Sequence, residues 1–268
     1  MSSQKELLTL IKSKTMKNKI KMIVTDLDET LLKTDKSISE NTKSVLISCR
    51  EAGFKVVYAT GRGGSAEHKI SSDYFDGRII FNGAIARIND EIVYNRVIPY
   101  QSARPLLIAC NEYGLKTASQ FNGMDYSNFN VTNEWSFIKD YKMVDFSKHT
   151  LDAEKIYMVV NNADDVKFIE KHLNNDIYLT VSKDNLGQVM HKDATKSKAI
   201  AALAQKWEIN ASEIIAFGDD LNDIDMLRFA GISVAMENAL PEVKAIADYT
   251  CQNNNDDGVA NWLLEYLL

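Results

Sequence analysis

Short apolar runs that alternate with helical segments constrain the fold of this chain more than any other feature of its sequence. Residues 20–25, 54–59 and 78–81 are short, mainly apolar runs, which are typical of strands buried on both faces. Residues 39–52 carry apolar side chains at helical spacing, and Gly53 follows where a helix-ending glycine is expected. Strands separated by helices form parallel sheets, so the sequence predicts an α/β fold.

This alternation is interrupted in the middle of the chain and then returns. Residues 84–189 are rich in aromatic side chains and turns, with strands predicted at 154–160 and 177–181 and a helix at 164–173. Beyond them, the pattern predicts strands at 214–217 and 232–235 and helices at 195–207, 222–230, 241–247 and 258–268. We therefore expect an α/β core built from residues 1–83 and 190–268, with an α+β domain inserted at 84–189.

Composition excludes several classes of protein. The 268 residues carry a formal net charge of −6, without a basic stripe or an apolar run that could span a membrane, so we expect no nucleic-acid or membrane partner. Three distant cysteines indicate free thiols in a reducing cytoplasm, and four histidines without ligand spacing argue against zinc. We expect a cytoplasmic monomer or weak homo-oligomer. Its basic extension, residues 1–19, is either a docking helix or a solvated terminus.

Carboxylates gather where two of the predicted strands end. Asp26 and Asp28 follow the first strand, and Asp219 and Asp223 follow the strand at 214–217. Ligands bind beyond the carboxyl ends of parallel strands, so we expect these side chains at one edge. Like charges about 4 Å apart repel by about 4 kcal/mol at an effective dielectric of 20, and an all-oxygen set of ligands favours Mg²⁺. Asp223 also has the position of a helix cap, and both roles stay open.

Hydroxyl, amide and amine groups occupy the other predicted junctions. Thr60 and Gly61 follow the second strand, where a hydroxyl and backbone amides suit a phosphate oxygen. Asn82 and Gly83 end the third strand, where they either contact a substrate or turn the chain. Lys196 opens the helix after the insertion and either meets a phosphate or is solvated. Turn formation alone explains poorly why every strand end carries such residues.

Together these residues resemble the motifs of the haloacid dehalogenase superfamily, in particular the Cof-type phosphatases with a large class IIB cap. The four motifs are Asp-Leu-Asp-Glu-Thr at 26–30, Thr-Gly-Arg at 60–62, Lys196 within 194–198, and Gly-Asp-Asp-Leu-Asn-Asp at 218–223. The last continues as Ile-Asp-Met-Leu at 224–227, and lesser signatures stand at 81–84 and 256–260. The resemblance covers the chain from about residue 20 to its end. It implies a Rossmann-like core with a parallel sheet and an inserted α+β cap.

The resemblance also implies a role for each carboxylate. Asp26 is the implied nucleophile that takes the phosphoryl group, and Asp28 is the implied general acid and then base. The Asp26 carboxylate, the Asp28 carbonyl and the Asp219 carboxylate are implied to hold Mg²⁺. Asp223 is implied to support the metal, either directly or through its neighbours.

The other matched positions are implied to bind substrate and phosphate, and they are Thr60, Gly61, Asn82, Gly83, Asn222 and Lys196. Thr60 and Lys196 are implied to hold the transferring phosphoryl group, and Lys196 also restrains Asp26 as a catalytic residue. Asn222 is implied to orient Lys196 or the phosphate.

Two positions depart from the family pattern. Glu29 stands where glycine is usual, and a positive φ there would cost a side chain roughly 1–2 kcal/mol. Gly63 stands where proline is usual, which loosens the start of the helix expected after it.

The implied function is Mg²⁺-dependent hydrolysis of small phosphomonoesters, such as sugar phosphates or related metabolites, through an aspartyl-phosphate. The insertion is expected to set the choice of substrate. Two alternatives stay open: a phosphomutase on the same scaffold, and a non-catalytic regulator that binds a phosphorylated metabolite. A two-component receiver domain also clusters aspartates, but it is far smaller and carries no inserted domain.

Overall fold

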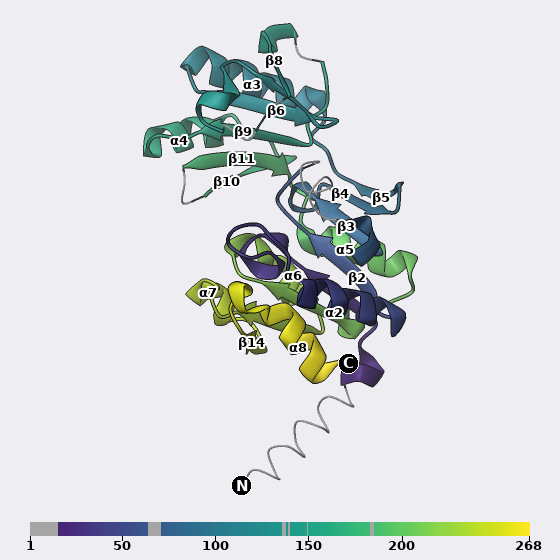
Figure 1. The fold of residues 1–268 in the computed structure, drawn as a ribbon. Coiled ribbons are helices and arrows are strands. Elements are labelled where there is room, and N and C mark those ends of the chain that lie inside the picture. Colours follow the sequence, from purple (N-terminus) through teal and green to yellow (C-terminus); the bar gives the residue numbers. More distant parts are fainter. Residues whose placement is uncertain (1–15, 64–70, 136–137, 139, 149, 183–184) are drawn as a thin grey trace. The chain divides into compact units, whose positions relative to one another are not determined.

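The computed structural model describes residues 16–63, 71–135, 138, 140–148, 150–182 and 185–268 (Figure 1). Most of the basic extension and the start of the helix expected after Gly63 lie outside these residues. The chain divides into two compact units. The core unit contains the chain up to Tyr94, apart from a short segment after Arg62, together with Thr195–Leu268. The inserted unit contains Asn95–Ala194.

The core unit is built on an eight-stranded sheet. Its strands are β1 (Met22–Thr25), β2 (Lys55–Ala59), β3 (Gly77–Ile80), β4 (Ile85–Ile88), β5 (Glu91–Asn95), β12 (Ile214–Gly218), β13 (Ile232–Met236) and β14 (Tyr249–Cys251). They lie in the order β14-β13-β12-β1-β2-β3-β4-β5. The strands from β14 to β3 pair in parallel, whereas β4 pairs antiparallel with β3.

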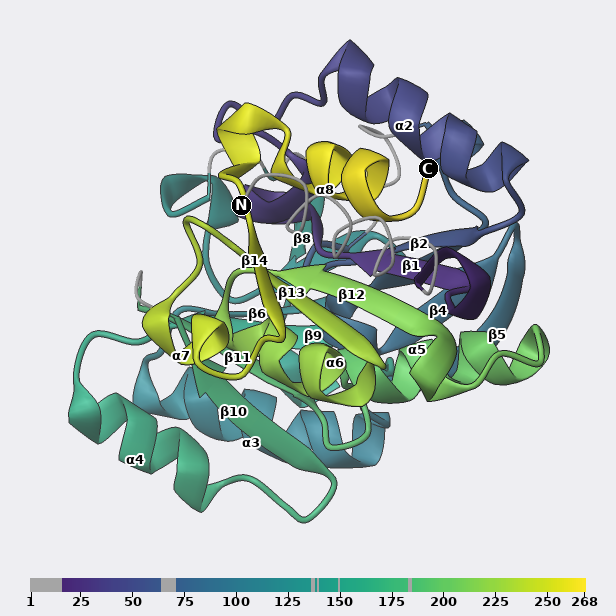
Figure 2. The same cartoon turned by 90° about the horizontal axis from the view of Figure 1, so that it is seen from below.

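Helices cover both faces of this sheet. They are α2 (Glu40–Glu51), α5 (Lys196–Lys206), α6 (Ile224–Phe229), α7 (Pro241–Lys244) and α8 (Gly258–Tyr266). α2 and α8 pack together on one face, and α5 and α6 pack on the other (Figure 2). Because both faces are covered, all four residues of β1 are fully buried, which explains an apolar run in place of alternation.

The sequence signals for helix ends act as expected. The Ser39 hydroxyl oxygen accepts a hydrogen bond from the Thr42 N–H at 3.0 Å and so caps the start of α2. Gly53 has a φ of 93°, the left-handed conformation that ends a helix. Single helical turns connect many of the elements: η1 (Leu27–Leu31), η3 (Ser72–Tyr74), η4 (Phe81–Gly83), η5 (Val131–Asn133), η6 (Phe146–Lys148), η7 (Ala211–Glu213), η8 (Leu221–Asp223) and η9 (Asn254–Asp256). None of the helices within the described ranges is long and apolar enough to cross a membrane.

The inserted unit has its own sheet and its own core. Its elements are α3 (Tyr100–Tyr113), β6 (Thr117–Phe121), β7 (Met124–Ser127), β8 (Tyr141–Met143), β9 (Lys155–Val159), α4 (Ala163–Lys171), β10 (Ile177–Val181) and β11 (Leu186–His191). The strands lie in the order β10-β11-β9-β6-β7-β8. Alternation along β9 supplies two faces: Ile156 and Met158 join the α3 and α4 core, whereas Tyr157 packs with Trp135 in a second cluster.

The borders of the inserted unit differ from those that we expected. Residues 84–94 were expected in the insertion, but β4 and β5 extend the core sheet beyond β3. Asn89, with a φ of 52°, and Asp90 form the two-residue connection between these strands. Residues 190–194 were expected in the core, but they belong to the inserted unit because β11 continues to His191.

Candidate active site

Four neighbouring strands of the core end in the polar residues that the sequence singles out. Asp26 follows β1, Thr60 follows β2, Asn82 follows β3 and Asp219 follows β12. The backbone continues the pairing past the strands: the Asp26 N–H donates to the Phe217 carbonyl at 3.0 Å, and the Asn82 N–H donates to the Thr60 carbonyl at 3.0 Å. Parallel pairing therefore brings these loops to one edge of the sheet, as the sequence predicts.

A buried lysine links two of the carboxylates. Lys196 is the first residue of α5, and Thr195 caps this helix by accepting from the Lys198 N–H at 3.3 Å. The Lys196 Nζ lies 2.6 Å from Asp26 Oδ1 and 2.6 Å from Asp223 Oδ1. Its side chain is fully buried, and a buried ammonium group requires such partners because burial removes its hydration.

Asp223 also holds the loop that carries Asp219. The second oxygen of Asp223, Oδ2, accepts from the backbone N–H groups of Asp219 at 2.9 Å and Asp220 at 3.1 Å. Asp223 thus holds the preceding loop, whereas it was expected to cap the helix that follows: it stands before α6 but its side chain makes no cap hydrogen bond to that helix. A Cβ at Gly218 would lie 2.6 Å from the Asp223 Cβ, which explains why glycine precedes Asp219. The Thr30 hydroxyl donates to Asp219 Oδ1.

Burial sets the electrostatics of this cluster. It raises the pKa of Asp26 well above its ordinary value, Lys196 opposes the rise, and Asp223 and Asp219 add to it. Burial also raises the pKa of Asp219 to about 7, although the hydrogen bond from Thr30 and the charge of Lys196 act in the opposite direction. For Lys196, burial alone would lower the pKa, but the Asp223 and Asp26 carboxylates outweigh it and raise the pKa.

The cluster fits a divalent cation. One oxygen from each of Asp26, Asp219 and Asp223 lies within 4.8 Å of the other two. When all three carboxylates are ionised, the one ammonium group of Lys196 leaves two negative charges to balance, and all the ligand atoms are oxygen. Such a site suits Mg²⁺. Both oxygens of Asp223 already accept hydrogen bonds, which leaves Asp26 and Asp219 as the better placed ligands.

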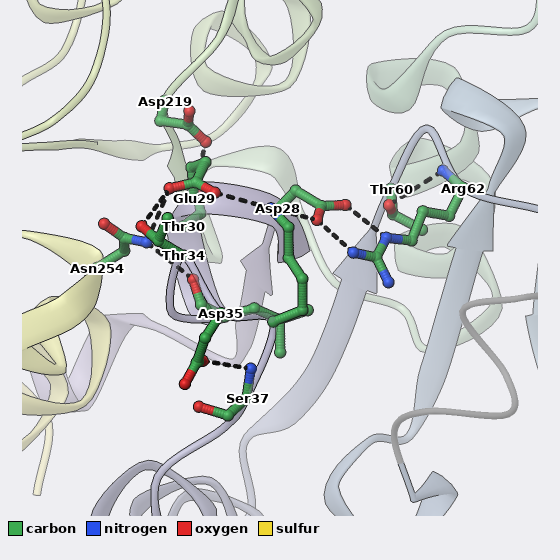
Figure 3. A network of polar contacts seen from close by, with 12 residues as sticks. Asp28, Glu29, Thr30, Thr34, Asp35, Ser37, Thr60, Arg62, Asp219 and Asn254 are labelled. Carbon is green, nitrogen blue, oxygen red and sulfur yellow. Dashed lines mark hydrogen bonds and ion pairs between the residues drawn. The ribbon is translucent and has the colours of Figure 1, made fainter. Parts of the chain in front are cut away.

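The carboxylate of Asp28 faces a different set of partners (Figure 3). It accepts hydrogen bonds from Arg62, with Nε at 2.6 Å from Oδ2, and Lys36 Nζ lies 3.2 Å from Oδ1. Burial alone would raise the pKa of Asp28, but Arg62 and Lys36 outweigh it and lower the pKa. We expected Asp28 to bind the metal through its backbone carbonyl. Its carboxylate is therefore available for proton transfer.

The expected phosphate-binding residues lie at the same edge. The Thr60 hydroxyl oxygen accepts from the Arg62 N–H at 3.1 Å (Figure 3). Asn222 Nδ2 donates to Asn82 Oδ1 at 3.0 Å, whereas Asn222 was expected to orient Lys196 or the phosphate. A Cβ at Gly61 would lie 2.9 Å from the same Asn82 oxygen, so glycine allows this close approach.

Several residues around Asp28 were given no role from the sequence. Arg62 lies in a recognised motif, and Glu29 was noted for its departure from glycine, with a φ of 56° in the structure. Lys36 and Asn254 carry no sequence signal, because each meets its partners through loops whose course the sequence does not reveal.

Comparison with known proteins identifies the family of this chain. The model of the haloacid dehalogenase-like hydrolase family matches residues 23–263. A 5-amino-6-(5-phospho-D-ribitylamino)uracil phosphatase of Bacillus subtilis, YitU, is 28% identical, and the match covers 94% of this chain and 99% of that protein. A second Bacillus subtilis phosphatase of the same name, YcsE, is 27% identical over 93% of this chain and 96% of its own length.

Solved structures share the fold. A haloacid dehalogenase-like hydrolase from Bacteroides thetaiotaomicron is 26% identical with a TM-score of 0.81, covering 92% of this chain and 99% of that one. A phosphatase of the same superfamily and organism is 25% identical with a TM-score of 0.82, covering 92% and 95%. Because the family model spans nearly the whole chain, this protein belongs to the haloacid dehalogenase-like hydrolases and is a phosphatase of that family.

Proposed function

We propose that this protein hydrolyses small phosphomonoesters with Mg²⁺ through a phosphorylated Asp26. The observation that carries the proposal is the buried Lys196, which lies 2.6 Å from both Asp26 and Asp223. A protein that only bound phosphate would not need to bury a carboxylate at the position of a nucleophile. Phosphate-monoester hydrolysis is among the slowest uncatalysed reactions, and a covalent intermediate divides it into two easier steps.

In the first step, an oxygen of Asp26 attacks phosphorus and the bond to the ester oxygen breaks. Asp28 donates a proton to the departing oxygen, which leaves as an alcohol. Lys196 orients Asp26, and we assign the binding of the phosphoryl oxygens to Thr60 and Asn222. Asp26 and Asp219 would hold Mg²⁺, which when bound would supply positive charge to offset the charge on those oxygens.

In the second step, water attacks the phosphorus of the aspartyl-phosphate. Asp28 accepts a proton from this water, the bond between phosphorus and Asp26 breaks, and inorganic phosphate leaves. The lowered pKa of Asp28 favours the ionised form that accepts a proton. In the first step, a phosphate dianion beside Asp28 favours its protonated form instead, because like charges raise a carboxyl pKa.

The names of two relatives support a proposal for the substrate class. Both are phosphatases of 5-amino-6-(5-phospho-D-ribitylamino)uracil, whose phosphate sits on a sugar-derived chain. We propose that this protein likewise acts on a small metabolite with a phosphorylated sugar or polyol, and that residues 95–194 select it.

The test is a panel of phosphorylated metabolites assayed with Mg²⁺ for release of inorganic phosphate. Asp26→Asn, which is nearly isosteric, should reduce turnover by at least about 10³-fold because it removes the nucleophile. Asp35→Asn is the matched control, since Asp35 is an exposed carboxylate of the same loop whose contact is to Ser37. Release of phosphate by Asp26→Asn within tenfold of the wild type would contradict the proposal. A phosphomutase would return the phosphoryl group to a second hydroxyl and release little phosphate.

A further inference from the structure

Glu29 has a backbone conformation that disfavours its own side chain. Its φ is 56° and its ψ is 9°, in the left-handed region that glycine adopts without strain. The residue directly follows Asp28, in the loop that carries the proposed nucleophile. Contacts of its side chain must therefore offset the strain.

The Glu29 carboxylate joins three segments of the core unit (Figure 3). Its Oε2 accepts from the Thr34 hydroxyl at 2.8 Å and from Asn254 Nδ2 at 3.2 Å. Its Oε1 accepts from Lys36 Nζ at 2.7 Å. Its backbone carbonyl accepts from Asn238 Nδ2 at 2.7 Å. These bonds fix the carboxylate in place, although its backbone geometry suits glycine.

Lys36 links the Glu29 carboxylate to the Asp28 carboxylate. The same ammonium group that meets Glu29 lies 3.2 Å from Asp28 Oδ1. Lys36 itself has a φ of 66°, so its backbone is also in the left-handed region. On its other side, the Asp28 carboxylate meets Arg62. The carboxylate is thus held between two cations, one fixed by Glu29 and one carried by the loop after β2.

Exposed ion pairs of this kind stabilise a fold weakly, which leaves orientation as their main effect. The side chains of Lys36 and Asp28 are 38% and 34% exposed. Half-exposed pairs contribute little to stability because water screens them. Proton transfer, in contrast, requires a carboxylate within hydrogen-bond distance of the reacting oxygen and correctly oriented.

We propose that Glu29 and Lys36 form a positioning pair that orients the Asp28 carboxylate for proton transfer. The inference rests on the proposed function, because it assigns to Asp28 the exchange of protons with substrate and water. It explains why a glutamate occupies a position with the backbone geometry of glycine.

The experiment compares Glu29→Gly, Lys36→Met and the double variant with the wild type. Glycine fits the backbone at position 29, so this variant should fold, with a Tm within about 4 °C of the wild type. Both single variants should lose roughly tenfold in kcat with KM changed less than about twofold, because the phosphate-binding residues are untouched. The double variant should lose no more than the worse single one, since both act through one contact.

Two further variants make the test specific. Lys33→Met is the matched control: it removes the same charge from the same loop, and the partner of Lys33 is Asp257 at 3.5 Å. Its kcat should equal that of the wild type. Glu29→Gln keeps an oxygen that can accept from Lys36, so it should recover part of the kcat lost in Glu29→Gly.

Crystal structures of the wild type and Glu29→Gly give a readout that does not depend on turnover. We expect Lys36 Nζ within hydrogen-bond distance of Asp28 in the wild type and away from it in the variant. A wild-type kcat in Glu29→Gly, an equal loss in Lys33→Met, or an unmoved Lys36 would each overturn the inference. A wild type that releases no phosphate from any metabolite would instead overturn the proposed function, and the structures would still test the pair.

Discussion

At the scale of single residues, the candidate site is an arrangement of charges that cannot be buried separately. Lys196 is fully buried, and it lies between Asp26 and Asp223. Removing one member of a buried pair leaves an uncompensated charge, which costs about 3–5 kcal/mol. Asp219 stands apart from this pairing, since its carboxylate meets the Thr30 hydroxyl and not the ammonium group. It is the group whose charge a metal would balance.

The raised pKa of Asp219 therefore predicts how pH and Mg²⁺ together affect the stability of the folded protein. Its pKa in the folded protein is about 7, against an ordinary value of 3.8. The folded state thus holds a proton that the unfolded chain releases, so this group contributes stability below about pH 4 that is lost as the pH rises through 7. Mg²⁺ that binds the ionised carboxylate offsets the loss. It should raise the Tm by about 5–10 °C at pH 8 when present at a hundred times its Kd, and by much less at pH 5.5.

Thermal unfolding by circular dichroism, with EDTA or with Mg²⁺, measures this difference. Asp219→Asn should remove the dependence on Mg²⁺ at both pH values, because the amide cannot be ionised. An equal Mg²⁺ effect at pH 5.5 and pH 8 in the wild type would count against Asp219 as a ligand.

Motifs near the strand ends could be predicted from the sequence, whereas the network around Asp28 could not. Lys196 is the lysine that the resemblance implies, and the structure buries it at the start of α5. Lys192 instead meets Asp176 at the surface. The contacts of Lys36 to Asp28 and Glu29 depend on left-handed backbone at two loop residues, which sequence pattern does not encode.

At the scale of elements, the apolar runs predicted the parallel strands of the core well. β1, β2, β3, β12 and β13 lie within one or two residues of their expected bounds, because strands buried on both faces carry an unbroken apolar signal. β4, β5 and β14 were missed. β5 is largely exposed, and β14 has three residues, so neither carries such a run.

The junction of η4 with α5 explains how these elements set the position of Lys196. Gly83 has a φ of 100°, and a Cβ there would lie 2.2 Å from the carbonyl carbon of Thr195 and 2.7 Å from the Lys196 nitrogen. The end of β3 and the start of α5 can approach this closely only without a side chain at residue 83. Gly83, in the lesser signature at residues 81–84, therefore acts on the proposed catalytic lysine through packing.

Gly83→Ala should destabilise the fold and lower kcat together. The added methyl group forces the start of α5 away, which displaces Lys196 from Asp26. Gly53→Ala is the matched control, because Gly53 has a φ of 93° but no atom within 4 Å of its added Cβ. The control should lose about 1–2 kcal/mol from the backbone alone and keep its kcat. Gly83→Ala should lose at least about 2 kcal/mol more, as overpacking does, in urea unfolding. Equal losses in the two variants would show that close packing at residue 83 is unimportant.

At the scale of the whole molecule, the chain passes from the core unit into the inserted unit and then back into the core unit. It leaves the core after Tyr94 and returns at Thr195, one residue before Lys196. The core holds each residue that we assign to chemistry: Asp26, Asp28, Thr60, Lys196, Asp219 and Asn222. The inserted unit has a separate sheet and a separate core, so its sequence can change without disturbing that chemistry.

This organisation predicts a division of labour that an exchange of the inserted unit can test. Replacing residues 95–194 by the corresponding segment of YitU should shift the ranking of phosphorylated metabolites toward that of the donor. The borders observed at Tyr94 and Thr195 matter, because an exchange at residues 84 and 189 would split β4 from β3 and cut β11. Dependence on Mg²⁺ and on Asp26 should be the same in the chimera as in the wild type, since the core supplies both. The measurement is kcat/KM for each metabolite in the two parents and the chimera. If the chimera kept the ranking of this protein, substrate choice would reside in the core, and the inserted unit would serve another purpose.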